Sequence, residues 1–161
     1  MNWKRSIPQQ HMEAFGRNNQ LKIAMIMLAA GNSRRFGGNK LLYEVDGMPM
    51  YLHALEQLRK AKESLQEDLT ELKITVVTQY EEIAKTAQAQ GIQVLFNPHP
   101  ELGISSSIKI GLNANTDADA QLFTVSDQPW LSWRTICELI REFQNSEKGI
   151  ACVSYQGRMG N

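Results

Sequence analysis

The chain has 161 residues with 17 basic and 17 acidic side chains, so its formal net charge is zero. A neutral chain lacks the broad basic surface on which nucleic-acid binding depends, and no apolar run approaches the length of a membrane-spanning helix. We therefore expect neither a nucleic-acid partner nor a membrane. The length predicts a single domain with a hydrophobic core of its own.

The first 20 residues differ in composition from the rest of the chain. They are polar, rich in Asn and Gln, and without a clear hydrophobic period, which predicts an N-terminal extension (1–20) before a domain that covers residues 21–161. They also lack the apolar region of a secretory signal. Cys137 and Cys152 form neither a disulfide framework nor a metal-binding pattern, so we expect two buried, reduced cysteines and a cytoplasmic protein.

Short β-branched runs alternate with amphipathic runs along residues 21–161. Strands are predicted at 22–28, 72–78, 92–96, 120–125 and 150–154, a short extended piece at 41–45, and helices at 50–66, 81–90, 105–115 and 133–143. Ile108, Leu112 and Ile104 are expected on the apolar face of the third helix. Alternation of this kind predicts an α/β fold, a three-layer Rossmann-like domain with a mainly parallel sheet. Ligands of such folds bind beyond the carboxyl ends of the strands.

The segment after the first strand, residues 28–40, is called the glycine loop below. It reads Leu28-Ala29-Ala30-Gly31-Asn32-Ser33 and continues through Arg34 and Arg35 to Lys40. Small residues allow a tight turn whose backbone N–H groups can bind anions, and the three cations add positive charge. The spacing fits neither a Walker A motif nor G-x-G-x-x-G. On this segment alone, a solvated surface loop remains an equal alternative.

Two later loops carry polar groups to the same edge of the predicted sheet. Asp127 ends the fourth strand beside Pro129, where a carboxylate suits Mg²⁺ or, alternatively, caps a turn. Ser105, Ser106 and Ser107 begin a predicted helix, where we expect one of them to be the N-cap. The same helix start can also attract an anion.

Taken together, these motifs resemble the MobA-like nucleotidyltransferases, and more closely the molybdenum cofactor cytidylyltransferase branch. The glycine loop matches L-A-A-G-x-S-x-R-F-G-x-x-K, followed in order by G-I-S-S-S-I at 103–108, S-D-Q-P at 126–129 and Q-G-R-M-G-N at 156–161. The resemblance covers about residues 22–161, and several ordered motifs are more specific than any one of them.

The resemblance implies a fold of the nucleotide-diphospho-sugar transferase type and a Mg²⁺-dependent transfer of CMP from CTP to a phosphorylated acceptor, with release of pyrophosphate. The implied acceptor is molybdopterin or the molybdenum cofactor. The implied catalytic residues are Arg35, Lys40 and Asp127, with Asp127 as the magnesium ligand. The implied nucleotide-binding residues are Leu28, Ala29, Ala30, Gly31, Asn32, Ser33, Lys40, Ser105, Ser106 and Ser107.

Alternatives remain for the base and for the activity. Ala30 favours CTP, because the guanylyltransferase branch usually has a second glycine at this position; GTP is the alternative. Sugar or polyol-phosphate nucleotidyltransferases share L-A-A-G. The chain also stops at Gly160-Asn161, where the family continues, so we expect a C-terminally truncated domain. A non-catalytic chaperone that loads a molybdenum hydroxylase such as xanthine dehydrogenase is therefore a second hypothesis.

Overall fold

The computed structural model describes residues 21–33, 36–66, 71–146, 148–155 and 158–159. The expected N-terminal extension, both arginines of the glycine loop and most of the 156–161 motif lie outside these ranges. Within them, none of the helices is long and apolar enough to cross a bilayer.

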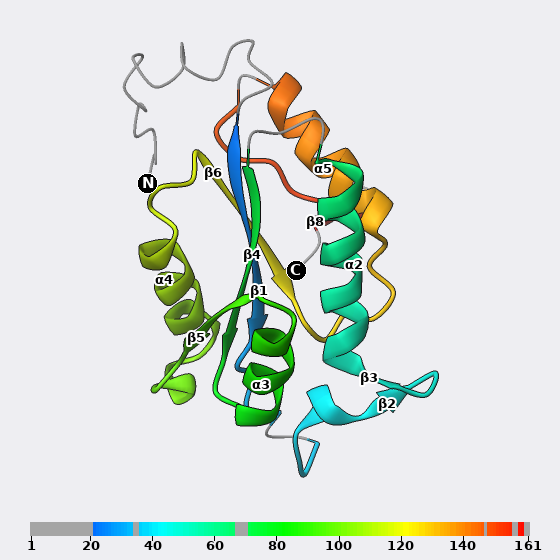
Figure 1. The fold of residues 1–161 in the computed structure, drawn as a ribbon, viewed down its shortest axis with the longest axis vertical. Coiled ribbons are helices and arrows are strands. Elements are labelled where there is room, and N and C mark those ends of the chain that lie inside the picture. The colour runs from blue at the N-terminus through cyan, green and yellow to red at the C-terminus, as the bar shows by residue number, and fades with distance from the viewer. Residues whose placement is uncertain (1–20, 34–35, 67–70, 147, 156–157, 160–161) are drawn as a thin grey trace.

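Four parallel strands form the central sheet, in the order β5-β4-β1-β6 (Figure 1). They are β1 (Lys22–Ala29), β4 (Glu71–Thr78), β5 (Gln93–Phe96) and β6 (Ala120–Val125). The chain runs outward from β1 through β4 to β5 and then returns to the other side of β1 as β6. The strand order therefore reverses at β1, which predicts a ligand site at the carboxyl ends of β1 and β6.

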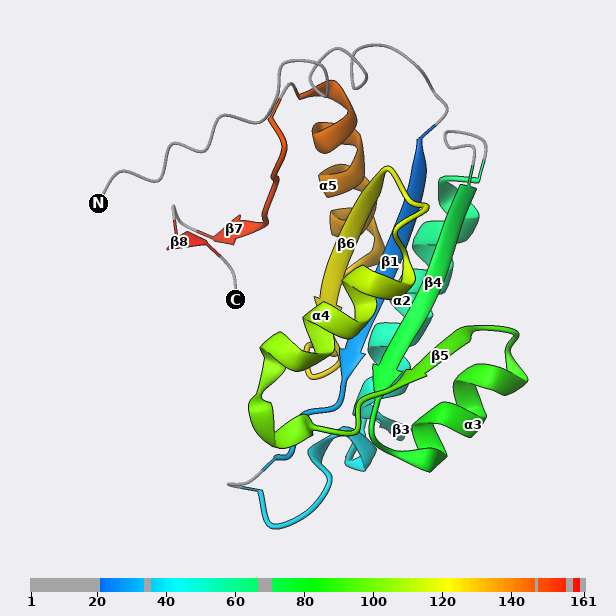
Figure 2. The same cartoon turned by 90° about the vertical axis from the view of Figure 1, so that its left-hand side faces the viewer.

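Helices cover both faces of this sheet and make three layers (Figure 2). The first face packs against α2 (Met50–Ser64), α3 (Glu81–Ala89) and α5 (Trp133–Asn145), and the second against α4 (Ile104–Ala114). Strand β1 alternates between them, with Met25 and Met27 in the first core and Ala24 and Ile26 in the second. Burial on both faces explains its continuous apolar run. The predicted α/β class is confirmed.

The segment predicted as an extended piece at 41–45 is extended only in its second half. A 3₁₀ turn, η2 (Lys40–Leu42), comes first because the Asn39 side chain accepts a hydrogen bond from the Leu41 amide at 3.0 Å. Only β2 (Glu44–Val45) is extended, and it pairs with β3 (Met48–Pro49) in an antiparallel hairpin. The Asp46–Gly47 turn between them has two positive φ angles, 50° and 78°, as a two-residue hairpin requires. A second 3₁₀ turn, η3 (Pro100–Leu102), precedes α4.

The prediction of a last strand at 150–154 is wrong. Residues 150–153 are not in a strand, and β7 (Ser154–Tyr155) pairs only with β8 (Arg158–Met159), in a small antiparallel sheet of its own. Ile150 is 85% exposed, so this apolar run gains none of the burial that makes such a run a strand. Cys152 lies in the same run and is exposed, against expectation, whereas Cys137 is buried in α5 as predicted.

Candidate functional site

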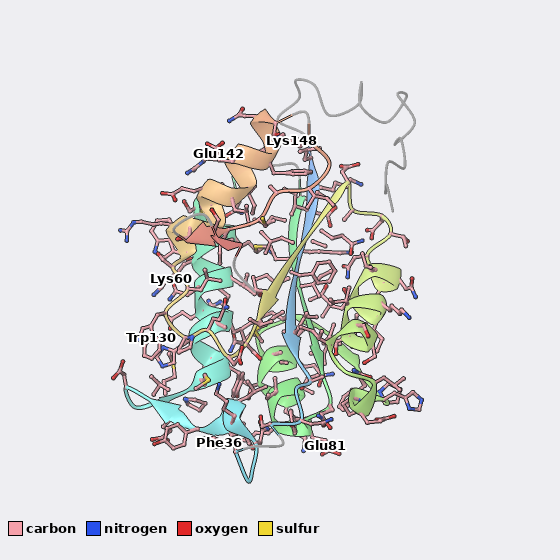
Figure 3. All side chains as sticks on the ribbon, turned by 180° about the vertical axis from the view of Figure 1, so that it is seen from behind. Phe36, Lys60, Glu81, Trp130, Glu142 and Lys148 are labelled. Atoms are coloured by element: carbon pink, nitrogen blue, oxygen red, sulfur yellow. The ribbon has the colours of Figure 1, made fainter. Side chains whose placement is uncertain are left out.

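A cavity of about 480 Å³ opens at the carboxyl edge of the sheet and is called the carboxyl-edge cavity. Its walls come from the glycine loop, the loop between β5 and α4, and the loop after β6, which are the three loops expected to meet. Phe36 of the glycine loop and Glu81 at the start of α3 lie at this end of the molecule (Figure 3). The lining residues are Leu28, Ala30, Gly31, Asn32, Ser33, Lys40, Leu41, Pro100, Glu101, Gly103, Ile104, Ser107, Val125, Ser126 and Asp127.

An ion pair joins two of these loops across the cavity. The Lys40 ammonium nitrogen lies 3.6 Å from a carboxylate oxygen of Asp127, and the two side chains are 39% and 48% exposed. A pair this exposed contributes little to stability, so either group can exchange its partner for a ligand. One cation and one hard oxygen donor side by side suit a polyphosphate with its divalent counter-ion.

The glycine loop itself is held by local contacts. The Ser33 hydroxyl accepts a hydrogen bond from the Lys40 amide at 3.3 Å, which brings the two ends of the loop together. Ser33 has a φ of 45°, and its carbonyl accepts from the Phe36 amide at 2.8 Å. At the base of the loop, the Ser126 hydroxyl donates to the Leu28 carbonyl at 2.9 Å. The loop is therefore tied both to itself and to the end of β6.

The three serines predicted to bind nucleotide are not equivalent. Ser107 is buried and lines the cavity, whereas Ser105 and Ser106 do not line it. The Ser106 hydroxyl lies 2.8 Å from the Gly103 carbonyl, within its own turn. The expectation that a serine is the N-cap is wrong, because α4 begins at Ile104 and Gly103, with a φ of 83°, occupies the cap position without a side-chain bond.

Asn97, which follows β5, fixes the serine segment and was missed by the sequence argument. Its side-chain oxygen accepts from the His99 amide at 2.9 Å, which orients the amide group. Its nitrogen then donates to the hydroxyls of Ser106 and Ser107, both at 2.8 Å. Because the Ser107 oxygen accepts from Asn97, its own proton is available to an acceptor in the cavity. The signal that could have revealed Asn97 is its place at a strand end on the same edge.

The remaining predicted residues can be placed as follows. Leu28, Ala30, Gly31, Asn32 and Ser33 line the cavity, while Ala29 is fully buried at the end of β1. Arg35 lies outside the described residues.

In the part of the chain that the structure describes, no group of three His, Cys, Asp or Glu side chains could hold a metal alone.

A glycine-containing turn after the first strand, at the point where the strand order reverses, is typical of a class of nucleotide-binding α/β domains. The model of the MobA-like NTP transferase domain matches residues 25–161, and the chain belongs to this family.

Curated relatives agree with this assignment. The chain is 32% identical over 136 residues to a probable molybdenum cofactor guanylyltransferase of Pyrococcus horikoshii, covering 83% of this chain and 62% of the relative. It is 29% identical to a protein of the same name from Thermococcus sibiricus, covering 80% and 59%. The chain thus spans about three-fifths of the length of these relatives.

Solved structures show the same fold at low sequence identity. A CMP:2-keto-3-deoxy-manno-octonic acid synthetase complexed with CTP superposes with a TM-score of 0.64 at 18% identity, over 78% of this chain and 48% of that one. Rv0371c from Mycobacterium tuberculosis superposes with a TM-score of 0.59 at 20% identity, over 78% and 62%. The expected nucleotidyltransferase type of fold is confirmed.

Proposed function

We propose that this domain binds a nucleoside triphosphate in the carboxyl-edge cavity and transfers its nucleotidyl group to a phosphorylated acceptor. The observation that carries the proposal is the meeting of Lys40 and Asp127, 3.6 Å apart, beside the glycine loop. Family membership supports nucleotidyl transfer. The names of the relatives support an acceptor of the molybdopterin type.

In the proposed reaction, an oxygen of the acceptor phosphate attacks the α-phosphorus of the triphosphate. A new phosphorus–oxygen bond forms, the bond to the β-phosphate oxygen breaks, and pyrophosphate leaves with the electron pair. The negative charge that grows on pyrophosphate is stabilised by Lys40, a point charge at the cavity wall. Positioning and charge neutralisation are sufficient, without a covalent enzyme intermediate.

Asp127 is the residue that would hold Mg²⁺. Its carboxylate is half exposed in the cavity, and a single carboxylate completed by phosphate oxygens is a common arrangement for this ion. When bound, Mg²⁺ supplies positive charge to the phosphate oxygens. A triphosphate would replace Asp127 as the partner of Lys40 and leave the carboxylate to the cation.

For the base, we propose CTP. Ala30 lines the cavity at the position where, by resemblance, the guanylyltransferase branch usually has a second glycine, and alanine there favours the cytidylyl branch. GTP is the second candidate, because the relatives are named guanylyltransferases.

Isothermal titration with CTP and GTP, each with and without Mg²⁺, tests the proposal. We expect CTP to bind more tightly than GTP and Mg²⁺ to strengthen binding. Lys40→Ala should weaken triphosphate binding by roughly 10- to 100-fold, the usual effect of removing a hydrogen bond to a charged group. Asp127→Asn should remove most of the Mg²⁺ dependence.

Lys60→Ala is the matched control. Lys60 also pairs with a carboxylate, that of Glu56 at 3.0 Å, but it lies on α2 outside the cavity (Figure 3). This variant should bind nucleotide as the wild type does. If the wild type binds no triphosphate, the transferase proposal is wrong, and a preference for GTP would contradict the cytidylyl assignment alone.

A further inference from the structure

Three consecutive residues at the end of β4 bind three consecutive carbonyl groups of the glycine loop. The Thr78 hydroxyl donates to the Ala29 carbonyl at 2.9 Å, and the Gln79 amide donates to the Ala30 carbonyl at 2.8 Å. The third bond runs from the Tyr80 hydroxyl to the Gly31 carbonyl, at 2.7 Å. The backbone register of β1 and β4 ends at Ala29 opposite Thr78. Beyond the strands, the side chains of Gln79 and Tyr80 therefore bind the backbone of the next two residues of the glycine loop, Ala30 and Gly31.

These bonds fix the direction of backbone N–H groups as well as of carbonyls. In a trans peptide the C=O of one residue and the N–H of the next lie in one plane and point in opposite directions. The described chain has no cis peptide bond. With the carbonyls of Ala30 and Gly31 held by the two residues that follow β4, the N–H groups of Gly31 and Asn32 point away from that side of the loop.

The side away from β4 is the side on which the cavity lies. In the sheet, β1 stands between β4 and β6, and the cavity is lined by Ser126 and Asp127 of the loop after β6. Successive N–H groups that point to one side form an anion-binding concavity. Carbonyl oxygens, which would repel an anion, are held on the other side.

We propose that Gln79 and Tyr80 are positioning residues, which turn the N–H groups of Gly31 and Asn32 toward the phosphates of a nucleotide in the carboxyl-edge cavity. The proposal rests on the proposed nucleotide binding and adds two residues that touch no ligand. Gln79 has a second contact of the same kind, because its amide also donates to the Asn32 side-chain oxygen at 2.8 Å. The Tyr80 hydroxyl is a neutral donor at physiological pH, because an ordinary tyrosine pKa lies near 10 and burial raises the pKa of Tyr80 further.

Tyr80→Phe is the direct test, because it removes the hydroxyl and keeps the ring, which packs on the larger core cluster. The measurement is the dissociation constant of Mg·CTP, and of tripolyphosphate as a probe that carries phosphates alone. We expect both constants to rise by about 3- to 10-fold, the usual effect of one neutral hydrogen bond. Equal loss for both ligands would locate the effect at the phosphates.

Tyr51→Phe is the matched control. The Tyr51 hydroxyl also makes one hydrogen bond, to Thr86 at 3.2 Å, but Tyr51 lies on α2 and does not line the cavity. Both variants should lower the melting temperature slightly, whereas only Tyr80→Phe should weaken phosphate binding. A purely structural role of Tyr80 would change the melting temperature and leave both dissociation constants as in the wild type.

Gln79→Met provides a second, independent variant, since it keeps the length of the side chain and removes the donor. It should weaken tripolyphosphate binding as Tyr80→Phe does. Wild-type affinities in both variants would overturn the positioning role alone. Failure of the wild type to bind any triphosphate would overturn the proposed function as well, so the two failures are distinguishable.

Discussion

Asn97 is almost completely buried. Its side-chain amide nevertheless helps to hold the cavity wall in place, because it binds Ser107, which lines the cavity. The carbonyl side of this amide is occupied by the His99 N–H and the amino side by two serine hydroxyls. These three hydrogen bonds connect the amide to the β5–α4 loop and the first turn of α4. This arrangement makes the two serines equal partners of Asn97 but leaves only Ser107 facing the cavity.

The two serines can be separated by mutation. Ser107→Ala should raise the dissociation constant of Mg·CTP by about 3- to 10-fold, because it removes a hydroxyl whose proton is free for the ligand. Ser106→Ala is the control, since it removes the same hydroxyl group from a position bonded within its own turn. Titration calorimetry on both variants is the measurement. Equal losses would show that the serine segment acts through the start of α4 rather than through Ser107.

At this scale the sequence could predict which loops meet but not which side chains face the ligand. The meeting of the loops that carry Lys40 and Asp127 could be predicted, because loops after parallel strands share one edge of the sheet, but the ion pair between them could not. Ser107 could not be distinguished from Ser105, because helical residues two positions apart point about 200° away from each other and the sequence did not show which face of the helix lies toward the cavity. Gln79 and Tyr80 act through backbone carbonyls, which no motif in the chain reveals.

Helix α4 illustrates the same difficulty for a whole element. Its buried positions are Ser107 and Gly111, followed by Asn115 at the cap, and they recur every fourth residue. The expected apolar face was partly wrong, because Ile104 and Leu112 are exposed and, of the three expected residues, only Ile108 packs on the second core. Small and polar residues occupy the buried face because α4 approaches β1 closely, and the isoleucines that reach the second core, Ile108 and Ile110, flank this face.

The closest approach of α4 to the sheet is at Gly111. A Cβ atom at this position would lie 2.8 Å from Cγ2 of Ile26 and 3.4 Å from a ring carbon of Phe123. Ile26 is fully buried and cannot move aside without disturbing the core. We expect Gly111→Ala to lower the free energy of unfolding by about 1–2 kcal/mol, since overpacking outweighs the better helix propensity of alanine. Urea denaturation measures the change.

Asn113→Ala is the control for this prediction, because Asn113 is an exposed position on the same helix. It should leave the stability unchanged or raise it slightly. Wild-type stability of Gly111→Ala would show that α4 can shift outward without loss.

Across the whole molecule, the two ends of the sheet differ in their contacts. The cavity lies at the carboxyl ends of the strands, whereas at the amino ends strand residues bind the loop before β6. There, the Lys73 ammonium group donates to the Asp117 carboxylate at 3.1 Å, and the Lys22 amide donates to Asp119 at 2.9 Å. The sequence predicted the parallel sheet that separates these two ends, because strand and helix patterns alternate. It could not predict Lys73–Asp117, since the pair depends on the register of β4 beside the loop before β6.

This separation predicts that acid stability and nucleotide binding can be changed independently. The hydrogen bond from Lys73 holds the pKa of the Asp117 carboxyl below its usual range. A lowered pKa in the folded state stabilises the protein above the unfolded value, near 3.9, and this contribution is lost as the pH falls through the folded value. Asp117→Asn should therefore melt slightly below the wild type at pH 7, and the difference should vanish at strongly acid pH.

The measurement is the melting temperature of both proteins between pH 7 and pH 2.5, with the affinity for Mg·CTP at pH 7 as a second readout. The difference should be small even at neutral pH, because the Asp117 side chain is 63% exposed and water screens the pair. Glu138→Gln, which removes an exposed carboxylate of α5, is the control for the change in net charge. The affinity for nucleotide should be the same in all three proteins, because Asp117 and Lys73 lie at the opposite end of the sheet from the cavity.

Two outcomes would contradict these expectations. A constant difference in melting temperature down to pH 2.5 would contradict the role of the ionised carboxylate. A change in affinity would contradict the independence of the two ends of the sheet.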